Sequence, residues 1–315
     1  MKKHFLFLLV FAVLVAACKK DEGFYNEFND GQEWTDNQAG NGNEPQTNEN
    51  NEDGSLTLYE VTGDAIAKIK DYEVPQSLLT YQQDYAKHQE IWDFVTRLLP
   101  LEERDKIGQF EVFHGGGEVL GYVTPVNEND LSKWRFGLAI DAAEQLDGID
   151  FKNLFTYVAI HEYGHVLTLN DGQVMAGSEA GCNNYFPGEG CSRSNSYINR
   201  MFELGWKDIY REFDENNPEP FYEKYKDRFV TDYAATNPAE DIAEVFAFFI
   251  TQENKPDASN IANQKIRLLY EFPELVDLRN KIRSTGSTVA LRAGSWRENP
   301  LYGKFKICGR KGCLH

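Results

Sequence analysis

The sequence predicts an α+β fold, in which a small sheet with an antiparallel edge packs beside helices that carry the functional residues. Residues 110–113, 119–126 and 134–140 have the composition and alternation of strands. Two strongly apolar segments with helical signals follow, at about 151–170 and 238–250. Strands and helices that are segregated along the chain in this way are typical of α+β domains.

The composition excludes two broad classes of protein. The 315 residues are 41% hydrophobic and 13% aromatic, which excludes a wholly disordered chain. There are 50 acidic and 32 basic residues, and the net charge is −18. Grooves that bind nucleic-acid phosphates need a basic face, so we expect no nucleic-acid partner.

Residues 1–17 have the pattern of an export signal. Lys2 and Lys3 precede an apolar run that ends at Ala17 and is too short to span a bilayer. The end of this run, with Cys18, resembles the bacterial lipobox, and residues 19–22 resemble a tag for export to the cell surface. The resemblance implies a signal peptide over 1–17 and a surface-exposed outer-membrane lipoprotein, anchored in the membrane by a lipid on Cys18.

The next segment, 18–54, is rich in Asn, Glu, Gln, Asp and Gly. Such a segment buries too little apolar surface to offset its ordering entropy, so we expect a disordered linker before a domain over 55–315. From 55 to 108 the pattern is mainly helical, with Ile66, Ile69 and Lys70 in one amphipathic run and a second run from Tyr85 to Leu98 that halts at Pro100. We expect a hairpin turn at the three glycines 115–117 and an edge strand over 134–140.

Apart from Cys18, four cysteines remain: Cys182, Cys191, Cys308 and Cys313. An even number fits disulfide bonding in an exported protein. The simplest of the three connectivities pairs Cys182 with Cys191 and Cys308 with Cys313. A metal site built from all four thiols is the rival interpretation, and it is disfavoured outside the cell.

The apolar segment 151–170 contains His161-Glu162-Tyr163-Gly164-His165. Residues four apart on a helix share a face, so His161 and His165 can bind one metal ion. Glu162 lies about 100° around the helix from His161, beside the ion, where a general base can act on water. Uncompensated polar groups are costly in so apolar a helix, and packing alone does not account for them.

Two regions offer a carboxylate as the third metal ligand. The paired histidines resemble the motif of the zincin metallopeptidases, and in one branch of that family the third ligand follows the second histidine by six residues, after a turn at a glycine. Asp171 has this place here, but Thr168 stands at the glycine position and resists the left-handed turn. The other region begins a second helix, with Asn237 as the expected N-cap.

In this second helix, Glu240 and Glu244 share one face. One can bind zinc, while the other accepts a hydrogen bond from a ligating histidine. Glu240 also occupies the capping-box position, where it would only satisfy a backbone donor.

The paired histidines with Glu162 resemble the motif of the zincin metallopeptidases, and a glutamate from a second helix resembles their gluzincin branch. Tyr233 and Glu244, seven residues before and four after Glu240, make this segment similar to the catalytic domain of anthrax lethal factor and its relatives. The long stretch 170–232 departs from that pattern. The resemblance implies a zincin-like fold with one zinc ion per chain, held by His161, His165 and Glu240. It further implies Glu162 as base, Tyr233 as donor to the oxyanion, and Glu244 as the partner of a ligating histidine.

The chain as a whole resembles the zinc metallohydrolase lipoproteins that are encoded beside TonB-dependent outer-membrane importers. This resemblance implies a role in nutrient acquisition, with such an importer as partner. The expected function is therefore hydrolysis of peptide bonds in a peptide or protein substrate. The alternative is a non-catalytic lipoprotein that captures substrate for an import complex. An open coordination position and the presence of Glu162 favour the enzyme.

Overall fold

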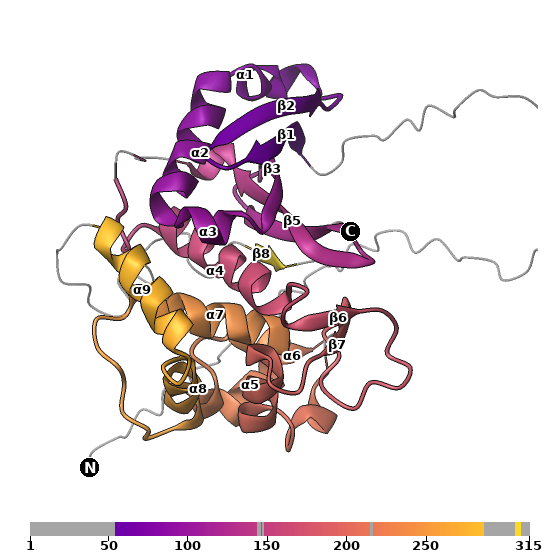
Figure 1. Ribbon diagram of the computed structural model, residues 1–315, viewed down its shortest axis with the longest axis vertical. Coiled ribbons are helices and arrows are strands. Elements are labelled where there is room, and N and C mark those ends of the chain that lie inside the picture. Colours follow the sequence, from indigo (N-terminus) through magenta and orange to yellow (C-terminus); the bar gives the residue numbers. More distant parts are fainter. Residues whose placement is uncertain (1–53, 144–145, 147, 215–216, 287–305, 310–315) are drawn as a thin grey trace, which may run out of the picture. The chain divides into compact units, whose positions relative to one another are not determined.

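The computed structural model describes residues 54–143, 146, 148–214, 217–286 and 306–309, the last four without their side chains (Figure 1). The described residues belong to one compact unit, Asn48–His315. The predicted signal peptide, Cys18 and the linker up to residue 53 lie outside the described residues. None of the helices in the described part of the chain is long and apolar enough to cross a membrane.

The described part of the chain contains a six-stranded sheet with the strand order β2-β1-β3-β5-β4-β8. The pairs β3–β5 and β4–β8 are parallel, and the other neighbours are antiparallel. These strands are β1 (Ser55–Thr62), β2 (Ala65–Asp71), β3 (Ile107–Phe113), β4 (Val119–Asn127), β5 (Asp130–Ala139) and β8 (Lys306–Gly309). Two short strands, β6 (Val174–Ala176) and β7 (Gly190–Ser192), form a separate ribbon.

The prediction of helix over 55–108 is confirmed for its second run, which is α2 (Tyr85–Leu98), and is wrong for the first. β1 and β2 form a hairpin, in which Thr62 pairs with Ala65 across a two-residue turn. Ile66 and Ile69 lie on β2, which is largely exposed, so their spacing does not mark the buried face of a helix. β1 is held by a partner far away in the sequence, β3, through pairs such as Tyr59 with Phe110. Such non-local pairing overrides the local pattern.

The predictions for residues 110–140 are correct in the existence of the strands and wrong in their arrangement. The expected edge strand, 134–140, corresponds to β5, which lies between β3 and β4 inside the sheet. The glycines 115–117 therefore join two strands that are not neighbours, and they do not form a hairpin turn. Strand order depends on which distant segments pair, and the local sequence does not encode this order.

The described helices are α1 (Leu79–Gln82), α2 (Tyr85–Leu98), α3 (Leu101–Arg104), α4 (Leu154–Leu169), α5 (Tyr197–Gly205), α6 (Pro218–Tyr225), α7 (Pro238–Thr251), α8 (Ile261–Leu269) and α9 (Pro273–Thr285). Figure 1 shows the sheet above α4 and α7 below it. α2 packs on the sheet and on α4, with the ring centroid of Trp92 5.2 Å from that of Phe110 and the ring centroid of Phe94 5.4 Å from that of Phe155. The predicted helices near 151–170 and 238–250 are confirmed as α4 and α7, and together with the sheet they confirm the α+β class.

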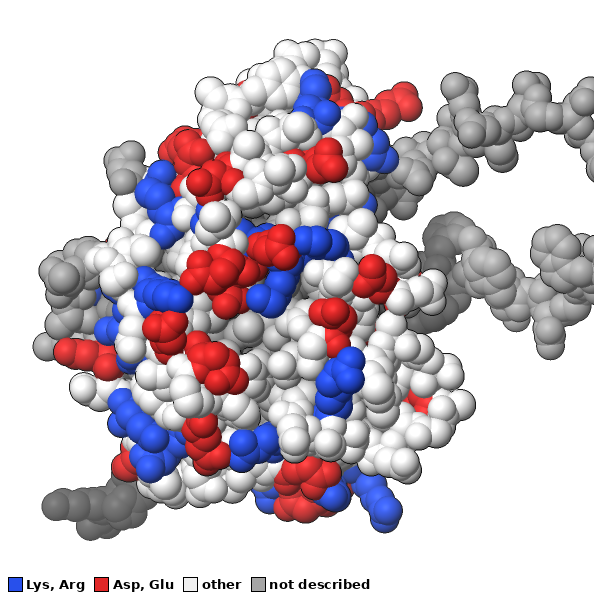
Figure 2. All heavy atoms as spheres, viewed as in Figure 1, with Lys and Arg blue, Asp and Glu red and all other residues white. Residues whose placement is uncertain are grey.

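The long stretch 170–232 supplies most of a second, smaller core beside α7. This Trp206 cluster consists of Trp206, Ile209, Phe221, Phe229, Ala234 and Ala235. Trp206 stacks on Phe221, with ring centroids 5.5 Å apart. On the face shown in Figure 2, acidic and basic side chains are interspersed over the described surface, and neither kind forms a continuous patch there.

Candidate metal centre

Helix α4 carries two histidines and a glutamate through the interior of the domain. Its N-cap Asn153 accepts a hydrogen bond from the Phe155 N–H at 2.8 Å. All its residues, Leu154–Leu169, are buried, because the sheet lies on one side and α7 on the other. His161, Glu162 and His165 have no exposed surface. Polar side chains at such positions require partners.

Helix α7 supplies the facing carboxylates, and its start has the predicted signals. Asn237 accepts hydrogen bonds from the N–H groups of Ala239 and Glu240, and Pro238 is the first helical residue. The two helices approach closely at Gly164. A Cβ atom added there would lie 3.1 Å from the Ala243 Cα. This close approach brings His161 and His165 of α4 within reach of Glu240 of α7.

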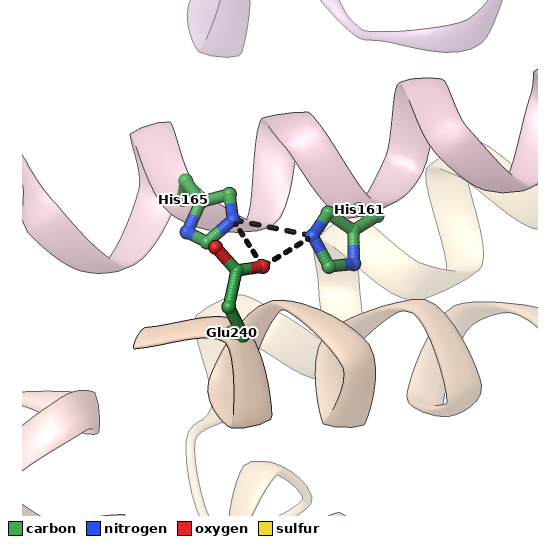
Figure 3. Close-up of side chains that lie close together, drawn as sticks. All are labelled: His161, His165 and Glu240. Carbon is green, nitrogen blue, oxygen red and sulfur yellow. Dashed lines mark hydrogen bonds and ion pairs between the residues drawn. The ribbon is translucent and has the colours of Figure 1, made fainter. Parts of the chain in front are cut away.

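Figure 3 shows His161 and His165 of α4 pointing toward Glu240 of α7. Glu240 Oε2 lies 3.1 Å from His161 Nε2 and 3.2 Å from His165 Nε2, and the two nitrogens are 3.2 Å apart. Three atoms that bind one tetrahedral ion at about 2.0–2.1 Å would lie about 3.3 Å from one another. The buried group His161, His165 and Glu240 could therefore hold a metal ion.

Glu244 determines which nitrogen of His161 faces this group. Its Oε1 lies 2.9 Å from His161 Nδ1, and it also accepts hydrogen bonds from Tyr157 at 2.7 Å and from Thr231 at 2.6 Å. Since a carboxylate can only accept, Nδ1 donates to Glu244, and in the neutral imidazole the lone pair of Nε2 therefore faces Glu240. Two acceptors facing one another require a positive charge between them, which a metal ion or an additional proton supplies.

The pKa values of the group point to the same requirement. Burial by itself lowers the pKa of His161, but hydrogen bonds with Glu240 and Glu244 outweigh burial and raise this pKa to about 10. Burial raises the pKa of Glu240, but the charge of His165 and hydrogen bonds with both histidines outweigh it and lower this pKa to about 2. The surroundings thus favour a positive charge beside the carboxylate.

Glu162 is buried in this site, and within the described part of the chain it lacks the hydrogen bonds that would offset the loss of its hydration. Neither of its carboxylate oxygens has a hydrogen-bond partner among the described residues. Burial raises its pKa well above the ordinary value, His161 opposes this rise, and Glu240 adds to it. Its stem packs against β4, where a Cβ added at Gly121 would lie 2.9 Å from Glu162 Cγ. An orphaned carboxylate next to a possible metal group is typical of a functional site.

Tyr233 lies in a short 3₁₀ helix, Tyr233–Thr236, directly before α7. Its ring centroid is 5.9 Å from that of His161. Burial, and after it the charges of Glu240 and Glu162, raise the pKa of this hydroxyl, so it stays protonated and can donate. The predicted oxyanion donor is therefore beside the metal group.

The other predicted residues are distributed as follows. Asp171 is exposed after the end of α4 and is not part of the group. The predicted disulfide between Cys182 and Cys191 is confirmed. Cys313 and the side chain of Cys308 lie outside the described residues.

Two residues of the site were missed by the sequence analysis. Tyr157, four residues before His161 and on the same helix face, could have been found from that spacing. Thr231 has no local signal, because it reaches Glu244 from the long stretch before α7.

A cavity of about 270 Å³ lies apart from this group, between the β4–β5 turn and the loop between β6 and β7. Its lining residues are Thr124, Pro125, Glu128, Asn129, Gly177, Ser178, Gly188 and Glu189. None of them belongs to the candidate metal-binding group of His161, His165 and Glu240, so this cavity is a separate feature.

Comparisons with protein-family models, with curated proteins and with solved structures find no match to this chain. The geometry of the site is thus the basis of its functional interpretation.

Proposed function

We propose that this protein is a zinc metallopeptidase of the gluzincin type with a zincin-like fold, which hydrolyses peptide bonds in a peptide or protein substrate. The observation that carries the proposal is one arrangement of four side chains. Two histidine nitrogens and a glutamate oxygen meet within 3.2 Å of one another, beside a buried glutamate whose oxygens have no hydrogen-bond partner among the described residues.

The donor set favours zinc over other common divalent ions. Two imidazole nitrogens and one carboxylate oxygen are the ligands of many catalytic zinc sites, whereas Ca²⁺ and Mg²⁺ prefer oxygen alone. Three protein ligands leave one tetrahedral position open, as catalysis requires. The hydrogen bond from His161 Nδ1 to Glu244 is the outer contact that orients a ligating imidazole.

In this proposal each residue has one role. When bound, zinc polarises the scissile carbonyl and lowers the pKa of water. Glu162 accepts a proton from the attacking water and passes it to the leaving amine. Tyr233 donates a hydrogen bond to the oxygen on which negative charge develops. Glu244 keeps His161 in the tautomer that presents its Nε2 to the metal.

The proposed setting comes from the N-terminal segment of the sequence. A lipid on Cys18 would anchor the protein in the outer membrane, exposed at the cell surface, and residues 19–54 would separate the domain from the membrane. There it would cut peptides for a TonB-dependent importer. The alternative, a capture lipoprotein with an idle metal, shares this setting and differs only in the chemistry.

The first test is metal content. We expect one zinc ion per chain in the purified protein, because three donors already lie at tetrahedral spacing. The double variant His161→Ala, His165→Ala should lose it, since two of the three ligands are gone. Elemental analysis measures both. Stoichiometric zinc in the double variant would refute the site, and an exposed control, Asp171→Ala, should retain the metal.

The second test separates the enzyme from the capture protein. Glu162→Gln keeps the size of the side chain but cannot accept the proton, so we expect zinc to stay bound while cleavage falls by about 10² or more. Cleavage of a proteome-derived peptide library, with and without chelator, provides the measurement. Equal rates in the parent and the variant would exclude Glu162 as the base. If the zinc-loaded parent cuts no peptide at all, the result favours capture.

A further inference from the structure

Two buried charged residues take no part in the proposed chemistry. Asp241 follows Glu240 on α7, and Lys265 lies on α8. Both side chains have 0% exposed surface, and Lys265 Nζ is 2.5 Å from Asp241 Oδ2. Lysine is rarely buried completely, and the cost of desolvating two charges can exceed their attraction. Stability alone therefore does not account for this pair.

The surroundings of Lys265 fit a lysine side chain closely. A Cβ atom added at Gly205, the last residue of α5, would lie 2.1 Å from Lys265 Cε. Lys265 Nζ lies 4.3 Å from the centre of the Phe229 ring. Trp206 Nε1 donates a second hydrogen bond to Asp241 Oδ2 at 2.7 Å. Asp241 is thus held by donors from two elements, α8 and the end of α5.

The first turn of α7 is therefore held on two sides. Consecutive residues on a helix project about 100° apart, so Glu240 faces the histidines of α4 while Asp241 faces Lys265. Asn237 caps the same turn from its end. A metal ligand has to be held within about 0.5 Å of its working position, and a small rotation of this turn would exceed that tolerance.

We propose that Asp241 and Lys265 are positioning residues for Glu240. Their ion pair sets the rotation of the first turn of α7 and so places the Glu240 carboxylate against the nitrogens of His161 and His165. This inference rests on the metal site of the proposed function. A charged pair in this pocket has one low-energy arrangement, whereas an apolar or amide pair of similar volume has several, which is the reason for a costly ion pair at this place.

The test compares Lys265→Met, Asp241→Asn and the double variant that carries both changes. Each single variant leaves a buried group without its partner, so we expect a lower Tm. The double variant removes both charges, and its Tm should return to near the parent value. Its zinc affinity, measured by competition with a chromogenic chelator, should stay at least tenfold below that of the parent. The visible absorption of its Co²⁺ complex should also differ, because the ligand geometry has changed.

A matched control lies at the other end of α7. Arg279 donates hydrogen bonds to the carbonyls of Phe249 and Gln252, so Arg279→Met should lower the Tm and leave zinc affinity and the Co²⁺ spectrum unchanged. If the double variant does not fold, Asp241→Glu decides the question. It keeps the charge, lengthens the side chain, and should weaken zinc binding at least tenfold.

The outcomes separate this inference from the proposed function. Parent-like zinc affinity and Co²⁺ spectrum, in the folded double variant or in Asp241→Glu, would overturn the positioning role and leave the metal site intact. A parent protein that binds neither zinc nor Co²⁺ would refute the metal site itself, and the positioning role with it. Metal binding without peptide cleavage would refute only the enzymatic activity.

Discussion

The imidazole of His161 is held at both of its nitrogens, and this makes the roles of the surrounding carboxylates distinguishable. Glu240 meets Nε2 and Glu244 meets Nδ1, so only Glu240 is placed to share a metal ion with His165. Tyr157 and Thr231 hold Glu244 in turn. Mutation of the ligand Glu240 and mutation of the outer partner Glu244 should therefore reduce zinc affinity by different amounts.

We expect three carboxylate variants to rank in one order. Glu240→Ala removes a ligand and should nearly abolish zinc binding, whereas Glu244→Ala removes only the outer hydrogen bond and should weaken binding about 10- to 100-fold. Asp171→Ala, at an exposed residue outside the group, should change nothing. Competition titrations against a chromogenic chelator give the ranking. If Asp171→Ala causes the largest loss of zinc affinity, the gluzincin assignment is excluded. The protein could then still be a zinc hydrolase, with Asp171 as a ligand.

At this scale the sequence is informative wherever the relation between residues is local. His161, Glu162 and His165 lie on one helical turn, and Glu240 and Glu244 lie on another, so helix geometry alone pairs them correctly. Thr231 reaches Glu244, and Lys265 reaches Asp241, from elsewhere in the fold, and no spacing in the sequence indicates either contact.

The site depends on the packing of helices α4 and α7 against each other, and Gly164 sets the distance between them. A Cβ added there would lie 3.1 Å from the Ala243 Cα and 3.2 Å from Phe246 Cδ1. Contacts this short require α7 to retreat by a few tenths of an ångström. Glu240, on the first turn of α7, would retreat with it.

We therefore expect Gly164→Ala to weaken zinc binding about tenfold and to lower the free energy of unfolding by about 1 kcal/mol, because overpacking outweighs the gain in helix propensity. Urea unfolding and chelator competition measure the two effects. Gly148→Ala is the control, since a Cβ added there meets nothing within 4 Å. If Gly164→Ala has the parent's stability and zinc affinity, the two helices accommodate the added methyl group without displacing Glu240.

The same contrast between local and distant interactions explains which elements could be predicted. α4 and α7 are strongly apolar and carry their own caps, Asn153 and Asn237, so their existence follows from local sequence. The local sequence of β1 and β2 favours a helix, because the partner that stabilises β1, β3, lies about 50 residues further along the chain. The local sequence also predicts β5 as an edge strand. In the sheet β5 has β3 on one side and β4 on the other, and no local signal shows the second pairing.

In the described part of the chain, the edge of the sheet nearest the site belongs to a strand from the far C-terminal segment. β8 pairs in parallel with β4, with Val119 opposite Lys306 and Val123 opposite Gly309. Between these pairs lies Gly121, which contacts Glu162. Figure 1 shows this edge strand, β8, beside α4. A substrate that pairs with the β4 edge through its backbone therefore has to take the place of β8.

This competition gives a prediction for the whole molecule. In the double variant Lys306→Pro, Ile307→Pro, two backbone donors of β8 are gone, and strands lose ladder hydrogen bonds when proline enters. Successive N–H groups of a strand point to opposite sides, so only one of the two lost donors faces β4. One such bond contributes about 0.5–1.5 kcal/mol, so we expect peptide cleavage to speed up about 2- to 10-fold at low substrate concentration. Leu314→Pro, five residues along the sequence from the last residue of β8, Gly309, is the control and should leave the rate unchanged. A synthetic peptide with the sequence of residues 303–312, added to the double variant, should slow it again. Unchanged initial rates in the double variant, with zinc still bound, would show that β8 and the substrate do not share the edge of β4.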